Sequence, residues 1–342
     1  MRFGEPIYLA EYVAERGFTR ETLGFKARVP LLNELCYDVM NRVNNRVTLT
    51  AGNIVAGLLM GYPRRGMTQS ELKALFVITV RHFHQRKVEL AFTEKKLELA
   101  MENALESFVQ SETLVRATVG GEAVVNIPEN KRSEMEYYKN NGIHFILDLS
   151  LVCMAFHCLH PNERTLENAG LFGRDVYDLL SQEFLIRGEF PTQDHIAAGF
   201  KAMERADALC LDGDRMVYGQ YRNGRDLVDI NGHMLQNFLE SYFVVAETLT
   251  EYTGETTQDR KQFLKQCLAK ARLLYAVGTI RRQESVNHVT FSNALTRFNK
   301  MGLISLRTAK GQKQPGVTVV DKKRDELLEL RNKIFTWTQR LN

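Results

Sequence analysis

Apolar side chains recur at spacings of three and four residues along most of this 342-residue chain. That spacing places them on one face of an α-helix, so the pattern predicts a series of amphipathic helices. The clearest stripes cover residues 35–47, 72–80, 97–108, 263–274 and 327–341. Strand-like runs are few and there are only seven prolines, so we expect a mainly α protein with small β-hairpins.

Capping signals predict where two of these helices begin. Thr68 is followed three residues later by Glu71, the spacing of a capping box, in which each side chain satisfies a free main-chain N–H of the first turn. Asparagines, which are poor helix formers, occupy the middle of the stretch 31–60, so a second helix is expected to begin at about Thr50.

Two segments share the order helix, helix, hairpin, helix, which is the outline of a winged helix. In the first, Gly120-Gly121 separates the apolar runs 114–118 and 123–127, and a helix follows from Ser133. In the second, the runs 303–306 and 316–320 flank a turn rich in Lys, Gln and Gly. The fold class predicted is therefore mainly α, with two winged-helix-like modules joined by a helical middle.

The first seven residues, MRFGEPI, predict a short strand that ends at Gly4 and Pro6. A strand needs a neighbouring strand, and no strand-rich segment follows for about a hundred residues. Either this strand docks onto a helical body, or it is the last strand of a domain that precedes it.

Composition excludes several classes of protein. The chain is 44% hydrophobic and 25% charged, as is typical of globular proteins. It has no run of about 18 apolar residues that would predict a membrane-spanning helix, and its first residues do not resemble a signal peptide. Five cysteines, odd in number and scattered, indicate reduced core residues of a cytosolic protein.

Charge is distributed unevenly along the chain. Residues 255–342 contain 18 Lys and Arg against 7 Asp and Glu, a net charge of +11, whereas the rest of the chain carries −7. This basic quarter is expected to face an acidic surface: anionic lipid, nucleic acid, an acidic protein or the acidic remainder of the same chain.

One cluster has residue types that bind zinc. Cys153 and His157 are four residues apart and would share one helix face, but Cys158 lies about 100° away from His157 on the same helix. Together with His160 the group lies in an apolar run, so core packing is the preferred interpretation.

Other candidate groups are weaker. His82 and His84 lie among basic residues, which is typical of a surface face, and Asp212–Asp214 resembles a calcium loop that lacks the remaining ligands. Arg64-Arg65 follows Pro63 and either binds a phosphate or lies in a solvated loop. Nucleotide-binding and nucleophile-elbow motifs are absent from the sequence, so no catalytic residue, metal or cofactor is predicted.

Three segments, in order, resemble the C-terminal half of the glycerol-3-phosphate acyltransferases. They are MRFGEPI (1–7), VMNRVNNRVTLTAGNIVAGLLM (39–60) and EYYKNNGIHFILDLSL (136–151). The first resembles the strand that closes the family's acyltransferase domain, and the second resembles the helix after it. The third resembles a Tyr-Tyr-Lys/Arg-Asn-Asn segment characteristic of the family. The similarity covers residues 1–155.

The resemblance implies a catalytic His followed five positions later by Asp, whose carboxylate orients the imidazole that deprotonates the glycerol hydroxyl. None of the eight histidines has Asp at that offset, and His144 has Asp148 one residue short of it. The family's phosphate-binding arginine motif and its Phe-Pro-Glu-Gly-type motif are also absent, and in relatives both precede the first segment. We therefore expect this chain to be inactive alone.

On this basis the chain is expected to be the C-terminal part of an enzyme that transfers an acyl group from acyl-CoA or acyl carrier protein to glycerol 3-phosphate. Its partners would be the catalytic half, in the same or a separate chain, and an anionic membrane at the cytoplasmic face. Four parts are expected: 1–30, a closing strand and linker of a missing acyltransferase domain; 31–160 and 258–342, the modules with hairpins; and 161–257, a helical middle.

A different class of function stays open, a winged-helix protein that binds nucleic acid or other proteins. Its support is the basic second module, where seven cations surround a helix and a wing. They are Arg281, Arg282, Arg297, Lys300, Arg307, Lys310 and Lys313. Its expected recognition helix (290–301) carries only two of them, few for contacts to a DNA groove, so nucleic acid is the less favoured partner.

Overall fold

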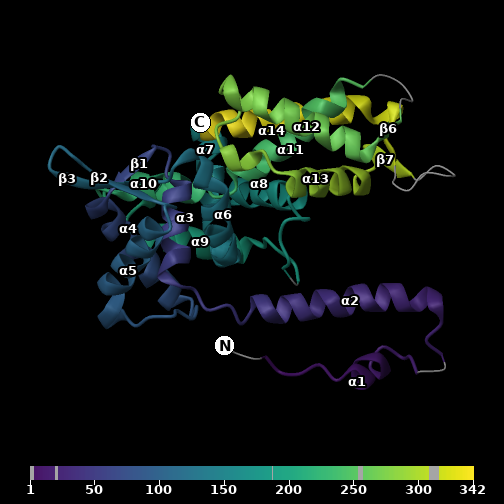
Figure 1. Cartoon of the computed structure of the whole chain (residues 1–342), viewed down its shortest axis with the longest axis horizontal. Coiled ribbons are helices and arrows are strands. Elements are labelled where there is room, and N and C mark those ends of the chain that lie inside the picture. Colours follow the sequence, from purple (N-terminus) through teal and green to yellow (C-terminus); the bar gives the residue numbers. More distant parts are fainter. Residues whose placement is uncertain (1–3, 20–21, 187, 253–256, 308–315) are drawn as a thin grey trace. The chain divides into compact units, whose positions relative to one another are not determined.

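The computed structural model describes residues 4–19, 22–186, 188–252, 257–307 and 316–342, and Figure 1 shows its elements. The chain separates into two compact units. Unit 1 comprises Met1–Thr48 with Leu185–Gly188, and unit 2 comprises Leu49–Phe184 with Glu189–Asn342. Both are described separately below. The prediction of a mainly helical chain with small antiparallel sheets is confirmed.

Unit 1 contains a short helix and a long one, α1 (Leu9–Ala14) and α2 (Phe25–Asn44). The Tyr12 hydroxyl donates a hydrogen bond of 2.9 Å to the buried carboxylate of Asp38, and the Arg16 guanidinium lies 3.4 Å from the centre of the Tyr12 ring. These contacts hold α1 against α2.

The strand predicted for the first seven residues is not formed by those of its residues that the structure describes. Gly4–Ile7 has neither helical nor strand hydrogen bonding, and residues 1–3 lie outside the described part. A single strand is stable only beside another strand, and among the described residues none pairs with this segment.

Unit 2 begins with a helix and a three-stranded sheet. Its elements are α3 (Ala51–Gly61), β1 (Gly66–Thr68), α4 (Gln69–Gln85), η1 (Glu94–Lys96), α5 (Leu97–Gln110), β2 (Val115–Val119) and β3 (Glu122–Asn126). The expected helix starts are confirmed, because Thr50 and Thr68 each form a complete capping box, with Asn53 and Glu71 respectively. The predicted hairpin is confirmed too, and β1 pairs with the outer edge of β3.

The helix expected from Ser133 is broken in the middle. The structure has η2 (Glu129–Lys131), α6 (Arg132–Gly142), the 3₁₀ turn η3 (Ile143–Phe145) and α7 (Leu147–Cys158), with a bend of 97°. Glycine is a poor helix former. At Gly142 a Cβ would also lie 2.8 Å from Cδ2 of Leu49, so glycine allows the Leu49 side chain to pack closely at the bend.

The middle of the chain adds four helices and a hairpin. They are η4 (Pro161–Glu163), α8 (Leu166–Leu179), α9 (Gln193–Arg205), β4 (Leu209–Asp212), β5 (Arg215–Tyr218), α10 (Gly224–His233) and α11 (Gln236–Thr250). The segment around Asp212–Asp214 therefore forms the turn of the β4–β5 hairpin.

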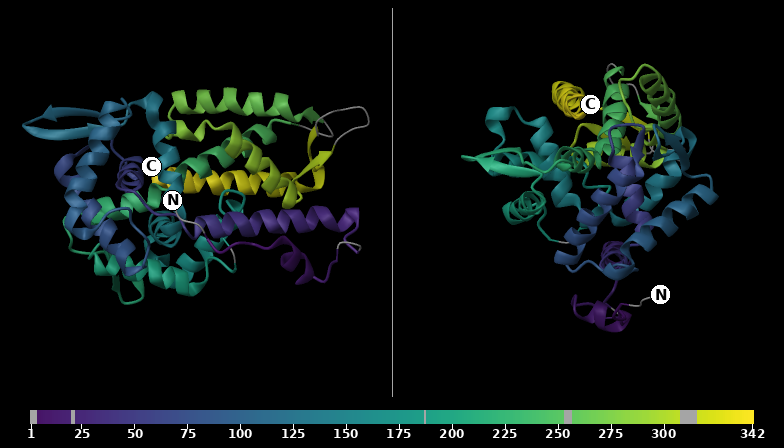
Figure 2. Two further views of the ribbon diagram at one scale, coloured as in Figure 1. Left: turned by 60° about the horizontal axis from the view of Figure 1, so that its bottom comes forward. Right: turned by 90° about the vertical axis from the view of Figure 1, so that its left-hand side faces the viewer.

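The last quarter repeats the order of the first part of unit 2. It contains β6 (Gln258–Asp259), α12 (Arg260–Ala276), η5 (Gln283–Ser285), α13 (His288–Lys300), β7 (Ile304–Arg307), β8 (Gly316–Val319), η6 (Asp321–Lys323) and α14 (Arg324–Leu341). The sheet order β6-β8-β7 matches β1-β3-β2, while the turn expected at 308–315 lies outside the described residues. The two sheets lie at opposite ends of unit 2 (Figures 1 and 2).

Two central helices form the core of unit 2. α7 packs against α8, α9, α10 and α14, and α11 packs against α12, α13 and α14. Nearly every residue of both helices is buried, and for α7 this explains why its apolar positions follow no one-sided stripe. No single helix in the described part is long and apolar enough to span a membrane. The bent pair of Glu129–Phe145 and Leu147–Cys158 is long and apolar enough when its two segments are taken together.

Candidate functional site

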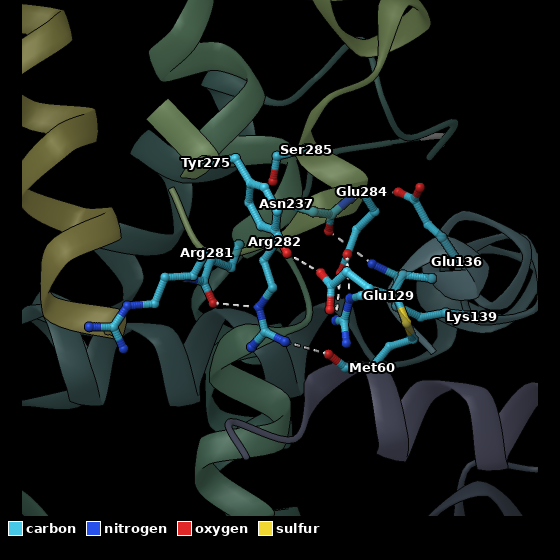
Figure 3. A network of polar contacts seen from close by, with 12 residues as sticks. Met60, Glu129, Glu136, Lys139, Asn237, Tyr275, Arg281, Arg282, Glu284 and Ser285 are labelled. Atoms are coloured by element: carbon cyan, nitrogen blue, oxygen red, sulfur yellow. Dashed lines mark hydrogen bonds and ion pairs between the residues drawn. The ribbon is translucent and has the colours of Figure 1, made fainter. Parts of the chain in front are cut away.

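Charged and polar side chains are buried together where α6, α11 and η5 meet the end of α3. Figure 3 shows this network, which joins segments more than 200 residues apart in the chain. Its buried members are Glu136, Lys139, Gln236, Asn237, Glu240, Ser241, Arg282, Glu284 and Ser285. Burial of so many polar groups is stable only when each is hydrogen-bonded.

Glu240 of α11 accepts hydrogen bonds from the turn before α13. The main-chain N–H groups of Arg281 and Arg282 each donate to its carboxylate at 3.0 Å, and the Ser285 hydroxyl donates at 2.6 Å. Burial raises the pKa of Glu240 above its ordinary value, although these donors act against the shift. The carboxylate therefore fixes the main chain of residues 281–285.

The family-like segment 136–151 contributes two charges to the network. Lys139 Nζ donates to Oδ1 of Asn237 at 2.9 Å and to the carbonyl of Met234 at 3.1 Å, and the Asn237 amide donates to Glu136 at 2.6 Å. Burial lowers the pKa of Lys139 and raises that of Glu136. These hydrogen bonds hold α6 against α11. The neighbouring Tyr137 takes no part in the network and is 69% exposed.

A bidentate ion pair joins α6 to η5. Nε and Nη2 of Arg132 donate to the two carboxylate oxygens of Glu284 at 2.8 and 3.0 Å. Burial acts to raise the pKa of Glu284, yet the hydrogen bonds and charge of Arg132, with the charge of Arg282, hold it below its ordinary value. Glu284 is therefore an anion in the core.

Arg282 connects this region to α3. Its Nε donates to the side-chain oxygen of Gln236 at 2.9 Å, and its Nη1 donates to the carbonyl of Met60 at 2.8 Å. The neighbouring Gly61 allows α3 to approach α10 closely, since a Cβ there would lie 2.5 Å from the carbonyl oxygen of Ile230. The last turn of α3 is thus held from two sides.

A pocket of about 450 Å³ opens beside this network, and we call it the arginine pocket. Five stretches of the chain line it: the loop after α3, the segment at the start of α6, the junction of α10 and α11, the end of α12 with the turn before η5, and the end of α14. Its lining residues include Tyr62, Arg64, Arg65, Glu129, Arg132, His233, Gln236, Tyr275, Arg281, Arg282 and Asn342.

The charges of the arginine pocket are unequal. Five arginines line it, against one side-chain carboxylate among the described lining residues, Glu129, which accepts a hydrogen bond from the Tyr275 hydroxyl. Arg64 is paired with Asp226 at 3.1 Å, and Arg281 donates to a main-chain oxygen of Asn342, the last residue of the sequence, at 3.0 Å. Within the described part of the chain, Arg65 and Arg282 have no carboxylate ion pair.

Tyr62 supplies a buried hydroxyl to the same pocket. The residue is 2% exposed, and its hydroxyl has no hydrogen-bond partner in the structure. Burial raises the pKa of Tyr62 to about 12, so the group is a neutral phenol at physiological pH. The Arg64 guanidinium lies 4.7 Å from the centre of its ring.

This arrangement is suited to holding an anion and not to acid–base chemistry. Both ring nitrogens of His233 contact main-chain carbonyl oxygens, of Asp229 and Leu341, and burial lowers its pKa to about 4. That histidine is therefore not available as a base. Guanidinium groups and a phenol are hydrogen-bond donors to an anion.

The structure disperses the residues considered for zinc. His157 lies 3.3 Å from Asp229, Cys158 Sγ contacts the carbonyl of Trp337, and His160 caps the turn η4 by accepting from Asn162. Burial raises the pKa of the Cys153 thiol. In the described part of the chain, no three His, Cys, Asp or Glu side chains are placed to hold a metal ion.

The two histidines of α4 have different environments. His82 lines a cavity of about 50 Å³ among apolar side chains, and burial lowers its pKa to about 4, whereas His84 lies 3.7 Å from Glu94. We expected both histidines on the surface. His82 instead faces α9, whose residues line the same cavities. Asp148 is buried and paired with Arg86 at 2.6 Å.

The cations proposed for nucleic-acid binding do not share one exposed face. Arg282 is buried in the network, and Lys300 donates to Gln182 at 3.1 Å. Nε of Arg297 is buried without a partner. Lys310 and Lys313 lie outside the described residues. This placement does not favour the nucleic-acid alternative.

Comparison with known families identifies the chain. The model of the glycerol-3-phosphate acyltransferase C-terminal region matches residues 1–307. The chain belongs to this family. The resemblance of the three segments is thereby confirmed, and the match extends well beyond the residues 1–155 that carried it.

Curated relatives of this acyltransferase C-terminal region are considerably longer. The putative acyltransferase plsB1 of Mycobacterium tuberculosis (strain ATCC 25618 / H37Rv) is 23% identical over 350 residues, which cover 99% of this chain and 52% of the relative. The glycerol-3-phosphate acyltransferase of Baumannia cicadellinicola is 21% identical over 277 residues, covering 79% and 32%. The chain thus spans about half the length, or less, of the curated relatives it matches.

The sequence presents the two arginine pairs of the pocket as unrelated features. Arg64-Arg65 indicates either a phosphate site or a solvated loop and Arg281-Arg282 belongs to the basic module, but a separation of more than 200 residues hides their proximity. Tyr62 and Arg132 carried no signal. The two paired arginines, each next to a turn, are the only sequence feature that could have suggested the site.

Proposed function

We propose that this chain is the C-terminal half of a glycerol-3-phosphate 1-O-acyltransferase and acts together with a catalytic half. The complete enzyme would transfer an acyl group from acyl-CoA or acyl carrier protein to glycerol 3-phosphate. The observation that carries the proposal is the match of residues 1–307 to a family model of the C-terminal region alone. The length of the curated relatives supports it.

The absence of the family's His-Asp spacing supports an accessory role for this half. Asp does not occur five positions after any histidine of the sequence. In the described residues, His82 and His233 have pKa values lowered by burial, and Asp148 is paired with Arg86. These groups serve packing, so the proton transfer of the reaction would come from the catalytic half.

An exposed apolar stripe on α2 supports the presence of a partner. Six apolar side chains fall on one face of this helix and are 42–82% exposed. They are Phe25, Val29, Leu32, Val39, Met40 and Val43. A continuous exposed apolar face is typical of an interaction surface. Because α2 directly follows the segment that resembles the closing strand, we propose that the stripe packs on the catalytic half.

We further propose that the two segments β1–β3 and β6–β8, with their helices, act as winged-helix-like scaffolds for protein contacts. The shared strand orders β1-β3-β2 and β6-β8-β7 support this. The basic last quarter would bring the enzyme to anionic lipid at the cytoplasmic membrane face, since each well-placed cation contributes about 1 kcal/mol. Flotation with liposomes tests this: binding independent of lipid charge and salt would contradict it.

The main test is thiol release from palmitoyl-CoA with glycerol 3-phosphate as acceptor. The purified chain would be assayed alone and mixed with the part of the mycobacterial relative that it does not match. We expect no activity alone and activity in the mixture. Thiol release by the chain alone would contradict the accessory role. Absence of thiol release in the mixture would contradict the proposal that the chain acts together with a catalytic half.

Variants of the stripe test the docking face in the same assay. Leu32→Asp with Val43→Asp places two charges in the proposed contact, and activity of the mixture should fall at least about tenfold. The matched control is Leu273→Asp with Val289→Asp, two apolar residues that are 61% and 65% exposed on α12 and α13. Denaturation of each variant would show whether a loss of activity reflects unfolding; equal losses in both pairs would contradict docking through α2.

A further inference from the structure

The arginine pocket has donors that its own residues leave unused. Arg282 donates through Nε and Nη1 to the uncharged oxygens of Gln236 and Met60, and it forms no ion pair with a described carboxylate. Arg281 donates through Nη1 to a main-chain oxygen of Asn342, the last residue of the sequence, and among the described residues its Nη2 and Nε have no hydrogen-bond partner. Arg65, across the pocket, is exposed and has no ion pair within the described residues.

Most side-chain carboxylates near these arginines do not line the pocket. Glu284 is engaged by Arg132, and Asp226 by Arg64. Glu240 uses its oxygens for main-chain N–H groups and hydroxyl or amide donors. Of the described lining residues, Glu129 alone carries a side-chain carboxylate, and it is engaged by Tyr275. The lining is therefore richer in cations than in anions, and the neighbouring side-chain carboxylates are engaged by other groups.

An unsatisfied hydroxyl supports a ligand at the same place. The phenol of Tyr62 is buried, lines the pocket and has no partner, although a buried polar group without a hydrogen bond costs about 1–3 kcal/mol. An oxygen-rich anion in the pocket would accept from this hydroxyl and from the arginines together.

We propose that the arginine pocket binds a phosphate monoester. A tetrahedral dianion has three free oxygens, enough to accept from Arg65, Arg281 and the Tyr62 hydroxyl, and guanidinium groups match its geometry. The volume of about 450 Å³ exceeds the space one phosphate needs, so part of the ligand beyond the phosphate would also enter. A soluble metabolite and a lipid headgroup both present this chemistry.

Figure 3 shows how the main chain positions the donors. Arg281 and Arg282 leave the turn in different directions, Arg282 toward Met60 and Arg281 toward α14. Glu240 fixes both main-chain N–H groups, and the Arg282 guanidinium is held without a ligand by its bonds to Gln236 and Met60. The site is thus preorganised on the side of Arg282, while the exposed Arg65 can close on an anion and the exposed Arg281 can reach it beside its contact with Asn342.

The test measures binding to this chain alone and is independent of the proposed enzymatic role. In one arm, calorimetry follows inorganic phosphate and glycerol 3-phosphate; in the other, flotation follows phosphatidylcholine vesicles with and without phosphatidic acid. Arg65→Ala with Arg281→Ala should weaken binding at least about tenfold, and Tyr62→Phe about fivefold. The control pair Arg174→Ala with Arg222→Ala removes the same charge from exposed positions outside the pocket.

The outcomes separate the two sources. Binding of the soluble phosphates that is lost in the pocket variants supports a metabolite, and binding only to phosphatidic acid vesicles with the same losses supports a lipid headgroup. Tyr62→Phe keeps the ring and its packing, so it reports on the hydroxyl even if the arginine pair perturbs the fold. No binding in either arm, or equal losses in the control pair, would overturn the proposal.

Discussion

Arg282 donates a hydrogen bond of 2.8 Å from Nη1 to the main-chain carbonyl of Met60, 222 residues earlier in the chain. Met60 lies in the last turn of α3, where carbonyl groups lack helical partners. The side chain therefore completes the C-terminus of α3 from the turn before η5, and it places Arg64-Arg65 beside Arg281-Arg282. The stability of unit 2 and the geometry of the arginine pocket depend on the same contact.

Replacing Arg282 should destabilise the protein strongly. Arg282→Ala leaves the buried oxygens of Gln236 and Met60 without a donor, and losing one partner of such a buried network costs about 3 kcal/mol. Urea unfolding followed by the fluorescence of the single tryptophan would measure it. Arg174→Ala, exposed on α8, is the control and should change stability by less than about 0.5 kcal/mol. A small effect at Arg282 would show that water replaces the guanidinium.

Glu183 should make the protein more stable in mild acid. Burial raises its pKa to about 7, against which the hydrogen bonds from Asn293 and Tyr242 act. The folded state therefore keeps a proton that the unfolded state releases near pH 4.5, and stability is lost as pH rises from about 4.5 to about 7. The expected loss from pH 5 to pH 8 is about 2 kcal/mol.

The variant Glu183→Gln isolates this contribution. Glutamine keeps the shape and still accepts from Tyr242, but it does not titrate. The free energy of unfolding is measured for both proteins between pH 5 and pH 8. Only the wild type loses stability from Glu183 as pH rises, so the difference between the two proteins should change by about 2 kcal/mol over this range. Parallel curves would mean that Glu183 is ionised throughout.

His82 should have the opposite dependence. Burial, followed by the charge of Arg86, lowers its pKa to about 4 from an ordinary 6.5. Only the unfolded state binds a proton between these values, so stability falls as pH drops from about 6.5 to about 4. His82→Leu places an apolar side chain in the cavity and removes this pH dependence. The free energy of unfolding of the variant, relative to wild type, should therefore be about 1–2 kcal/mol higher at pH 5 than at pH 8. A constant difference between the two proteins would contradict the burial of a neutral imidazole.

Local signals in the sequence predict local structure here. Thr68 and Glu71 form the expected capping box, and the spacing of Leu97 and Phe108 belongs to α5. Both hairpins of the repeated segments lie within a residue of their predicted positions, as far as the structure describes them. Such features depend on neighbours a few residues apart, which a single sequence displays directly.

Tertiary contacts account for what the sequence did not predict. At the break after Gly142 the chain packs closely against Leu49, and the apolar stripe does not reveal that contact. Likewise folding brings Arg65 and Arg281 to one pocket, and the burial of the Tyr62 hydroxyl without a partner is a property of the tertiary structure alone. Buried charges such as Glu240 resemble surface residues in sequence, because their partners lie on other elements.

The last helix, α14, lies beyond the matched residues 1–307 but should be essential to the fold of unit 2. It packs along α11 and α7, and its Ile334 is fully buried. Ile334→Ala would leave a cavity in this contact and lower the free energy of unfolding by about 3 kcal/mol. Leu328→Ala on the same helix removes a side chain that is 37% exposed and should cost less than about 1 kcal/mol. Trp337, one turn from Ile334, reports unfolding of both variants; equal small losses would mean that α14 is not integrated into the core.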